Sequence, residues 1–170
     1  PDLQLAGAGS LAAASGATTV RIDALKGAAF GFPVDLAAPA TIAIADGVTR
    51  LSDVALSAGG GEIRVAGAVS PELDVAVEIA SVAASFVNAI VPGLEASGTI
   101  SGTASVTGTP DAPAFQWSVN WADFAVAAAD SIGLPPLTVT ASGKGDLEGT
   151  TVDARATGGG LDLTASGNVP

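Results

Sequence analysis

The stretch Phe115-Gln116-Trp117-Ser118-Val119-Asn120-Trp121 alternates between a large apolar side chain and a polar one. Successive side chains of a β-strand point to opposite faces, so this alternation predicts a strand with one apolar face and one polar face. The same period of two recurs in three further segments, whose apolar positions are Ile63, Val65 and Val69, then Leu73, Val75, Val77 and Ile79, then Leu161 and Leu163. Many short strands of this kind predict an all-β protein.

Glycine-bearing segments separate the alternating stretches and are typical of hairpin turns. We expect such turns at residues 45–47, 58–61, 142–145 and 158–160. Strands joined by tight turns pair antiparallel, so the sheet is expected to be antiparallel.

One segment departs from the period of two. Residues 81–91 place Val82, Phe86 and Ile90 four apart, which is the spacing of one face of an α-helix. Ser81 is suited to cap the start of such a helix, and Pro92-Gly93 is suited to end it. We therefore expect one short amphipathic helix that covers an end or an edge of the sheet.

The chain also carries a weak internal repeat. Residues 51–69 align with residues 151–169, so that Asp53 matches Asp153 and Gly59-Gly60 matches Gly159-Gly160. The repeat units cover residues 3–71 and 94–170, with the expected helix between them. Repetition at constant strand phase favours an elongated, repetitive sheet over a closed sandwich, with residues 1–170 forming a single domain.

Composition narrows the possible functions. The net charge is −11, with 6 basic and 17 acidic residues, so binding to a nucleic-acid backbone is disfavoured by repulsion. His, Cys, Tyr and Met are absent, which removes Ser-His and Cys-His nucleophiles and the commonest metal ligand. We therefore expect no enzyme, no cofactor and no metal.

The remaining chemical alternatives have simple surface interpretations. Lys144 could in principle pair with a serine, but Ser142-Gly143-Lys144 resembles a polar turn. The carboxylates Asp146, Glu148 and Asp153 lie on alternating positions beside glycines, which indicates solvated surface more than a glycosidase or calcium site. Residues 28–45, the most apolar stretch, are interrupted by prolines and an aspartate, so no segment reaches the roughly 18–20 apolar residues of a membrane-spanning helix.

The candidate binding residues are the apolar positions of the alternating strands: Ile63, Val65, Val75, Val77, Phe115, Trp117, Val119, Trp121, Leu161 and Leu163. Two interpretations are open. The residues could form the core of a closed sandwich, or they could line an open groove that accepts a lipid chain. Both structures need strands with one apolar face, so periodicity does not separate them.

Several short motifs resemble the TamB family (translocation and assembly module). The stretch Pro92-Gly93-Leu94-Glu95-Ala96-Ser97-Gly98-Thr99-Ile100-Ser101-Gly102 is followed by Gly108-Thr109-Pro110-Asp111-Ala112-Pro113. In that family a short helix leads to a Pro-x-Leu, a Gly-rich strand and a Gly-Thr-x-x-x-Pro turn in the same order. Gly133-Leu134-Pro135 and the closing Gly159-Gly160-Leu161 are also similar.

The resemblance implies a fold and a function. TamB-like proteins are anchored in the inner membrane of double-membraned bacteria by a single helix, which would lie outside this sequence, and they extend into the periplasm as a curled β-sheet, a β-taco trough with an apolar interior. They act with a TamA-like outer-membrane barrel of the Omp85 type. They guide phospholipid acyl chains, unfolded β-barrel strands or both between the membranes in outer-membrane biogenesis, and the family has no catalytic motif. The alternative is a secreted or surface β-solenoid, such as an adhesin or autotransporter passenger.

Overall fold

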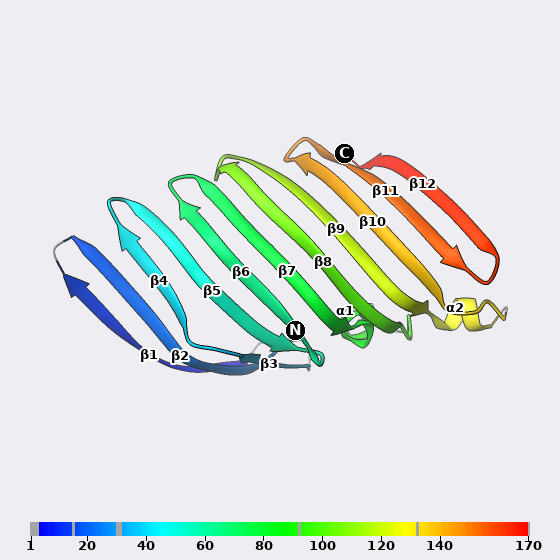
Figure 1. Ribbon diagram of the computed structural model, residues 1–170, viewed down its shortest axis with the longest axis horizontal. Helices are drawn as coiled ribbons and strands as arrows, with labels where there is room; N and C mark the ends of the chain where they lie inside the picture. Colours follow the sequence, from blue (N-terminus) through cyan, green and yellow to red (C-terminus); the bar gives the residue numbers. More distant parts are fainter. Residues whose placement is uncertain (1–3, 15, 30–31, 92, 132, 170) are drawn as a thin grey trace.

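The computed structural model describes residues 4–14, 16–29, 32–91, 93–131 and 133–169 (Figure 1). Strands make up 77% of the structure, in one twelve-stranded antiparallel sheet. The prediction of an all-β antiparallel protein is therefore confirmed.

Neighbouring strands in the sheet mostly follow one another in the chain. The order is β1-β2-β3-β5-β6-β7-β8-β9-β10-β11-β12, and β4 shares the position of β3 between β2 and β5. The bounds are β1 (Gln4–Ala14), β2 (Ala17–Ala29), β3 (Phe32–Leu36), β4 (Ala40–Ala45), β5 (Val48–Ala58), β6 (Gly61–Ser70), β7 (Leu73–Ala83), β8 (Ser97–Thr109), β9 (Ala112–Ala125), β10 (Leu137–Asp146), β11 (Gly149–Gly158) and β12 (Leu161–Val169). A β-solenoid stacks its strands in parallel, so this antiparallel order differs from the architecture that the adhesin alternative requires.

Three of the four expected turns are confirmed, at residues 46–47, 59–60 and 159–160. Gly59 and Gly159 have nearly the same φ, 54° and 55°, and both need glycine because the left-handed region penalises a Cβ atom. The shared geometry agrees with the proposed alignment of residues 51–69 with 151–169, although the larger repeat stays a prediction.

The expected turn at residues 142–145 is wrong. These residues lie inside β10, and the chain reverses instead at Leu147 and Glu148. Gly143 pairs with Trp117 on β9, and a Cβ atom at Gly143 would lie 2.8 Å from two atoms of the indole ring. The glycine here accommodates a neighbouring aromatic ring and does not mark a turn.

The predicted helix is shorter than residues 81–91 and begins later. Ser81 belongs to β7, so it caps no helix; the helical part is a 3-10 turn, η1 (Ala84–Phe86), followed by α1 (Val87–Ile90). Pro92, which was expected to end the helix, and the side chain of Ile90 lie outside the described residues. A second helical turn, α2 (Ala127–Asp130), connects β9 to β10 and was not predicted.

Both helical turns lie at the same end of the sheet (Figure 1). The amide of Ala127, at the start of α2, donates a hydrogen bond of 3.2 Å to the carbonyl of Leu94, which follows α1. The Asn88 side chain closes the α1 connection by donating to the Ala96 carbonyl (3.1 Å) and accepting from the Ala96 amide (2.6 Å). These contacts hold the two connections against the ends of the strands.

The core is small and consists mainly of alanine. The buried apolar residues are Ala40, Ala55, Ala58, Val82, Ala84, Ala96 and Leu137, and no large described side chain is fully buried. The strands contact their neighbours within the sheet. The described residues therefore form a single layer, with both faces of the sheet accessible.

Candidate functional site

Strand register brings all ten predicted binding residues to one face of the sheet. Residues paired directly across an antiparallel ladder point to the same side. Val75 pairs with Val106, which pairs with Phe115; Val65 pairs with Val77 and, through Ala104, with Trp117. Successive pairings connect Ile63 with Val119 in the same way. Trp121 pairs with Val139, which pairs with Ala156, which pairs with Leu163, and Leu161 lies on the same strand as Leu163. We call this side the apolar face.

The apolar face extends beyond the predicted residues toward β1. Val20 pairs with Ile42, which pairs with Leu51, so the face continues across β2, β4 and β5. This part of the face was not predicted. Two short alternations in the sequence could have indicated it, Val20-Arg21-Ile22 and Ile42-Ala43-Ile44.

Irregular strands add further apolar residues to the same face. Ile79 and Val82 both lie on it because the register shifts between them, and the same holds for Leu51 and Val54. Trp121 and Phe124 form the third such pair. A β-bulge inserts one extra residue, so residues three apart point the same way, which strict alternation does not anticipate.

An aromatic cluster occupies the end of the face near α2. The rings of Trp121 and Phe124 meet edge to face, with centroids 4.7 Å apart and an interplanar angle of 85°. The Trp121 indole N–H donates a 2.8 Å hydrogen bond to the carbonyl of Ser97. This bond satisfies the one polar atom of the ring and leaves its surface apolar.

The apolar face is uncharged, and most of its side chains are partly exposed. Eight of the ten predicted residues are half-buried by their neighbours, while Leu161 and Leu163 are exposed on β12. Every described charged residue lies on the opposite face, in a turn, in a connection or at a bulge. The described strands belong to one hydrogen-bonded sheet, so they do not form a sandwich of two separate sheets.

The opposite side, which we call the polar face, carries the hollows. Three of them, with volumes of about 860, 830 and 810 Å³, are bordered by rows of small polar side chains that cross the strands. Val77, Phe115, Trp117 and Val119 also line them, but those residues point to the apolar face by register. The three hollows thus lie on the polar face, and a lipid groove along the apolar residues stays a prediction.

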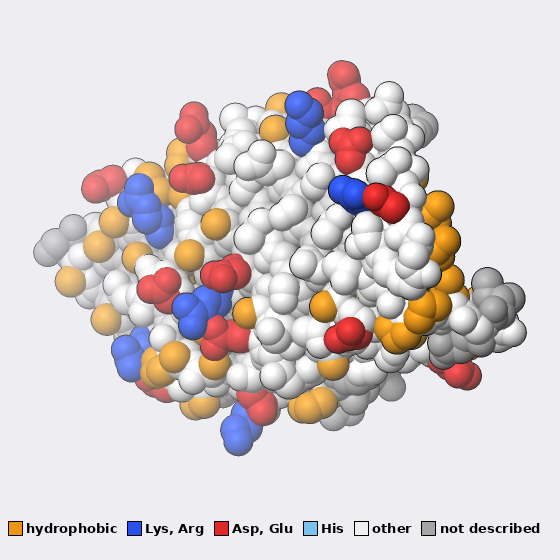
Figure 2. Space-filling view, turned by 45° about the vertical axis from the view of Figure 1, so that its right-hand side comes forward, with side chains coloured by type: hydrophobic (Ala, Val, Ile, Leu, Met, Phe, Trp, Pro, Cys, Tyr) orange, Lys and Arg blue, Asp and Glu red, His pale blue; other side chains and the backbone are white. Residues whose placement is uncertain are grey.

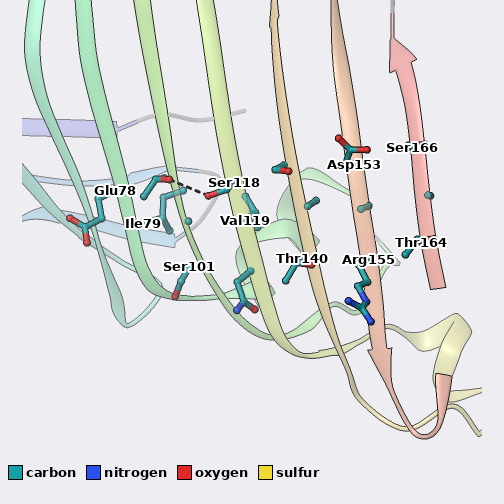
Figure 3. Close-up of a pocket in the computed structure, with 17 residues that line it drawn as sticks. Glu78, Ile79, Ser101, Ser118, Val119, Thr140, Asp153, Arg155, Thr164 and Ser166 are labelled. Atoms are coloured by element: carbon teal, nitrogen blue, oxygen red, sulfur yellow. Dashed lines mark hydrogen bonds between the residues drawn. The ribbon is translucent and has the colours of Figure 1, made fainter. Parts of the chain in front are cut away.

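Figure 3 shows the hollow of about 860 Å³, with Ser118 projecting from β9 and Asp153 and Arg155 projecting from β11. Thr103 and Ser118 hydroxyls are linked across β8 and β9 at 3.2 Å. In Figure 2, backbone and side chains that are neither hydrophobic nor charged occupy the middle of the visible face, with charged and hydrophobic groups scattered around them. This distribution is that of a solvated surface.

Charges on the polar face form local pairs. Arg155 on β11 binds Asp162 on β12 through two hydrogen bonds, Nε to Oδ1 at 2.8 Å and Nη2 to Oδ2 at 2.5 Å. The hydrogen bond from Arg155 lowers the pKa of the Asp162 carboxyl. Arg64 donates a single hydrogen bond from Nε to Glu62 Oε1 along β6, and this contact raises the pKa of Arg64.

The carboxylates and the lysine that were considered as chemical candidates lie on β10, on β11 and at the reversal between them. The described residues contain no cluster of three or more carboxylates that could hold a metal ion. Asp153 lies on β11 and points to the polar face, while Asp146 and Glu148 lie at the β10–β11 reversal, with Asp146 Oδ1 accepting from the Glu148 amide at 2.8 Å. Lys144 lies within β10, across from Gln116 and Thr151. These positions agree with the solvated-surface interpretation of the carboxylates.

Comparison of the chain with family models, with curated proteins and with solved structures gives no match. The resemblance to the TamB family therefore stays a prediction. Among the described helices, none has the length and apolar character needed to cross a membrane.

Proposed function

We propose that the apolar face of this sheet binds the acyl chains of phospholipids and guides them along the protein, without catalysis. The observation that carries the proposal is the uncharged, partly exposed apolar face that runs from β2 to β12. Soluble proteins rarely expose a contiguous apolar surface of this extent unless it contacts a partner or a lipid.

An acyl chain fits this face better than an unfolded polypeptide does. The backbone N–H and C=O groups within the sheet are used in the ladders, so the face presents side chains alone. A polypeptide lying there would leave its own backbone groups without partners, at a cost of about 1–3 kcal/mol for each buried group. An acyl chain has no such groups and needs only apolar contact.

The magnitude of binding suits passage more than storage. Full burial of a methylene contributes about 0.8 kcal/mol, and a single open face buries only part of each methylene. At about 4.8 Å per strand the face is on the order of 50 Å wide, which exceeds the hydrocarbon thickness of a bilayer. Many similar weak contacts along such a face allow a chain to slide.

The TamB resemblance supplies the cellular context of the proposal. In that context the protein is held at the bacterial inner membrane by a helix outside this sequence, faces the periplasm and works with a TamA-like Omp85 barrel. The motif order around Pro92-Gly93-Leu94 supports this part. It is separable from acyl-chain binding, which rests on the apolar face alone.

The experiment compares neighbouring residues of β9 that point to opposite faces. Val119→Asp places a charge on the apolar face, and Ser118→Asp places the same charge on the polar face. The chain and both variants are purified from bacteria, and bound phospholipid is quantified by mass spectrometry. We expect lipid with the unmodified chain and with S118D, and at least a several-fold loss with V119D. Equal lipid on all three, or none on any, would refute the proposal.

A further inference from the structure

Four two-residue turns lie at one end of the sheet, opposite the helical turns α1 and α2 (Figure 1). They join β4 to β5, β6 to β7, β8 to β9 and β10 to β11, and we call this end the hairpin end. Each of the four turns contains one acidic residue and neither Lys nor Arg; the acidic residues are Asp46, Glu72, Asp111 and Glu148. At about 4.8 Å per strand, successive turns are about 10 Å apart, so the four carboxylates form a row along the hairpin end.

Turn formation explains only part of this carboxylate row. Asp46-Gly47 has positive φ at both residues, 51° and 77°, which is the conformation that Asp-Gly favours, and aspartate is common in turns in general. Glutamate has no such preference, yet Glu72 and Glu148 occupy two of the turns. At the opposite end of the sheet, the two-residue turns are Gly59-Gly60 and Gly159-Gly160, which carry no charge.

The carboxylate row is not neutralised by basic side chains. All four acidic residues are exposed, and the ion pairs found among the described residues involve none of them. The basic residues closest to the turns in the sequence, Arg50 and Lys144, lie within β5 and β10 and point to the polar face. Proteins that select anionic lipids use clusters of Lys and Arg near the headgroup, and the hairpin end presents the opposite charge.

The apolar face also differs between its two ends. Toward the helical turns it carries the Trp121–Phe124 cluster and the buried Leu137, and the α1 and α2 connections lie against the strand ends there. Toward the hairpin end, its last positions on β8 and β10 are Gly108 and Gly145. An acyl chain that lies along the strands therefore gains most contact when its tail points to the helical turns, which leaves the hydrated headgroup at the hairpin end.

We propose that a phospholipid on the apolar face lies along the strands with its headgroup at the hairpin end, and that the face therefore prefers zwitterionic headgroups to anionic ones. This inference rests on the proposed binding of acyl chains. The apolar face supplies the contact, and the carboxylate row sets which headgroup can accompany it. A zwitterionic headgroup such as phosphocholine carries an ammonium group that the carboxylates attract, whereas an anionic headgroup such as phosphoglycerol is only repelled.

Fluorescence quenching measures the preference. Short-chain phosphatidylcholine and phosphatidylglycerol with identical brominated acyl chains are titrated below the concentrations at which they form micelles, so that no lipid aggregate contributes a surface charge. Quenching of Trp117 and Trp121 reports the affinity for each lipid. The Debye length falls from about 30 Å at about 0.01 M salt to about 3 Å at about 1 M. We expect at least about threefold tighter binding of the phosphatidylcholine at the lower salt concentration and about equal binding of both lipids at the higher one.

Charge variants show whether the carboxylate row is the cause. The first variant removes three charges from the row by Glu72→Gln, Asp111→Asn and Glu148→Gln. The control removes three charges from exposed positions away from the hairpin end by Glu78→Gln, Glu95→Gln and Asp153→Asn. At the lower salt concentration, we expect the first variant to bind the two lipids within about twofold of each other and the control to keep the preference. Equal loss of the preference in both would show that net charge is its source and would overturn the proposal.

The position of the bromine tests the orientation. Trp117→Phe and Trp121→Phe each leave one tryptophan, and Trp117 lies nearer the hairpin end of β9 than Trp121 does. Bromine at the methyl end of the acyl chain should quench Trp121 more strongly than Trp117, and bromine beside the ester group should do the reverse. The opposite order would overturn the proposed orientation.

Failure of this proposal and failure of acyl-chain binding give different results. Equal quenching by the two lipids at the lower salt concentration would overturn the headgroup preference and leave acyl-chain binding in place. Quenching by neither lipid would overturn acyl-chain binding and the preference with it.

Discussion

Ser81 in β7 and Asp123 in β9 have almost the same backbone conformation, with φ values of 55° and 53°. Each lies between two apolar residues three apart, Ile79 and Val82 in one strand and Trp121 and Phe124 in the other, and each coincides with a register shift. Asp53, with φ of 46°, has the same role between Leu51 and Val54. At each bulge the polar residue does not point to the apolar face, so the apolar face stays continuous.

Replacement of Asp123 tests the role of its conformation. Asp123→Val should lower the free energy of unfolding by about 1–2 kcal/mol, because a β-branched residue is penalised in the left-handed region. Asp123→Gly should leave it unchanged or slightly raised. Urea unfolding gives the values, and Gln116→Val, at an exposed position of β9 with ordinary backbone, is the control that should be nearly neutral. Equal effects of D123V and D123G would contradict this account of the bulge.

Substitution of Gly143 tests the packing of Trp117 on the apolar face. Gly143→Ala should destabilise the protein by about 1–3 kcal/mol, because the added Cβ would collide with the Trp117 ring and with the carbonyl of Thr151. Gly167→Ala is the matched control, since a Cβ atom there would meet nothing within 4 Å. Thermal or urea unfolding measures both. A neutral G143A would mean that Trp117 does not lie over β10.

The Arg155–Asp162 pair predicts a pH dependence with a definite sign. The pKa of Asp162 is lowered from 3.8 by the hydrogen bond from Arg155. The pair therefore stabilises the folded state fully at a pH above 3.8, because the carboxyl is then ionised in both the folded and the unfolded chain. The stabilisation is present above that value and is lost as the pH falls through the lower pKa of the folded state. Both side chains are exposed, so the effect should be small.

Asp162→Asn is the variant that isolates this effect. The urea midpoint of D162N should be slightly below that of the unmodified chain near neutral pH, and the two should converge as the pH falls through the lowered pKa of Asp162 in the folded state. A difference that stays constant through the acidic range would show that the ion pair is not its source.

Much of the sheet followed from side-chain alternation, because each residue's face is a local property of a strand. Phe115 to Trp121 lie on β9 as the period of two predicted, and the ten candidate residues share a face. β-bulges interrupt this alternation, and predictions based on it were wrong there. Val82 lies four residues before Phe86, which imitates a helix, but it reaches the apolar face only because of Ser81, and so the helix was predicted to begin too early.

Long-range features were beyond the sequence pattern. Gly143 was interpreted as a turn because the residue that needs its lack of a side chain, Trp117, lies on another strand. The absence of a second sheet among the described strands, and the location of the hollows on the polar face, depend on how strands assemble. Alternation gives each strand two faces but does not say what covers either one.

The central claim is that acyl chains contact the apolar face, and the two tryptophans report on it directly. Trp117 and Trp121 are the only tryptophans of the chain, and both lie on that face. The measurement is their fluorescence with phosphatidylcholine whose acyl chains carry bromine, which quenches only at contact, against the same lipid without bromine. We predict strong quenching by the brominated lipid in the unmodified chain and in Ser118→Asp, and its loss in Val119→Asp. Identical emission with brominated and unbrominated lipid would contradict the account.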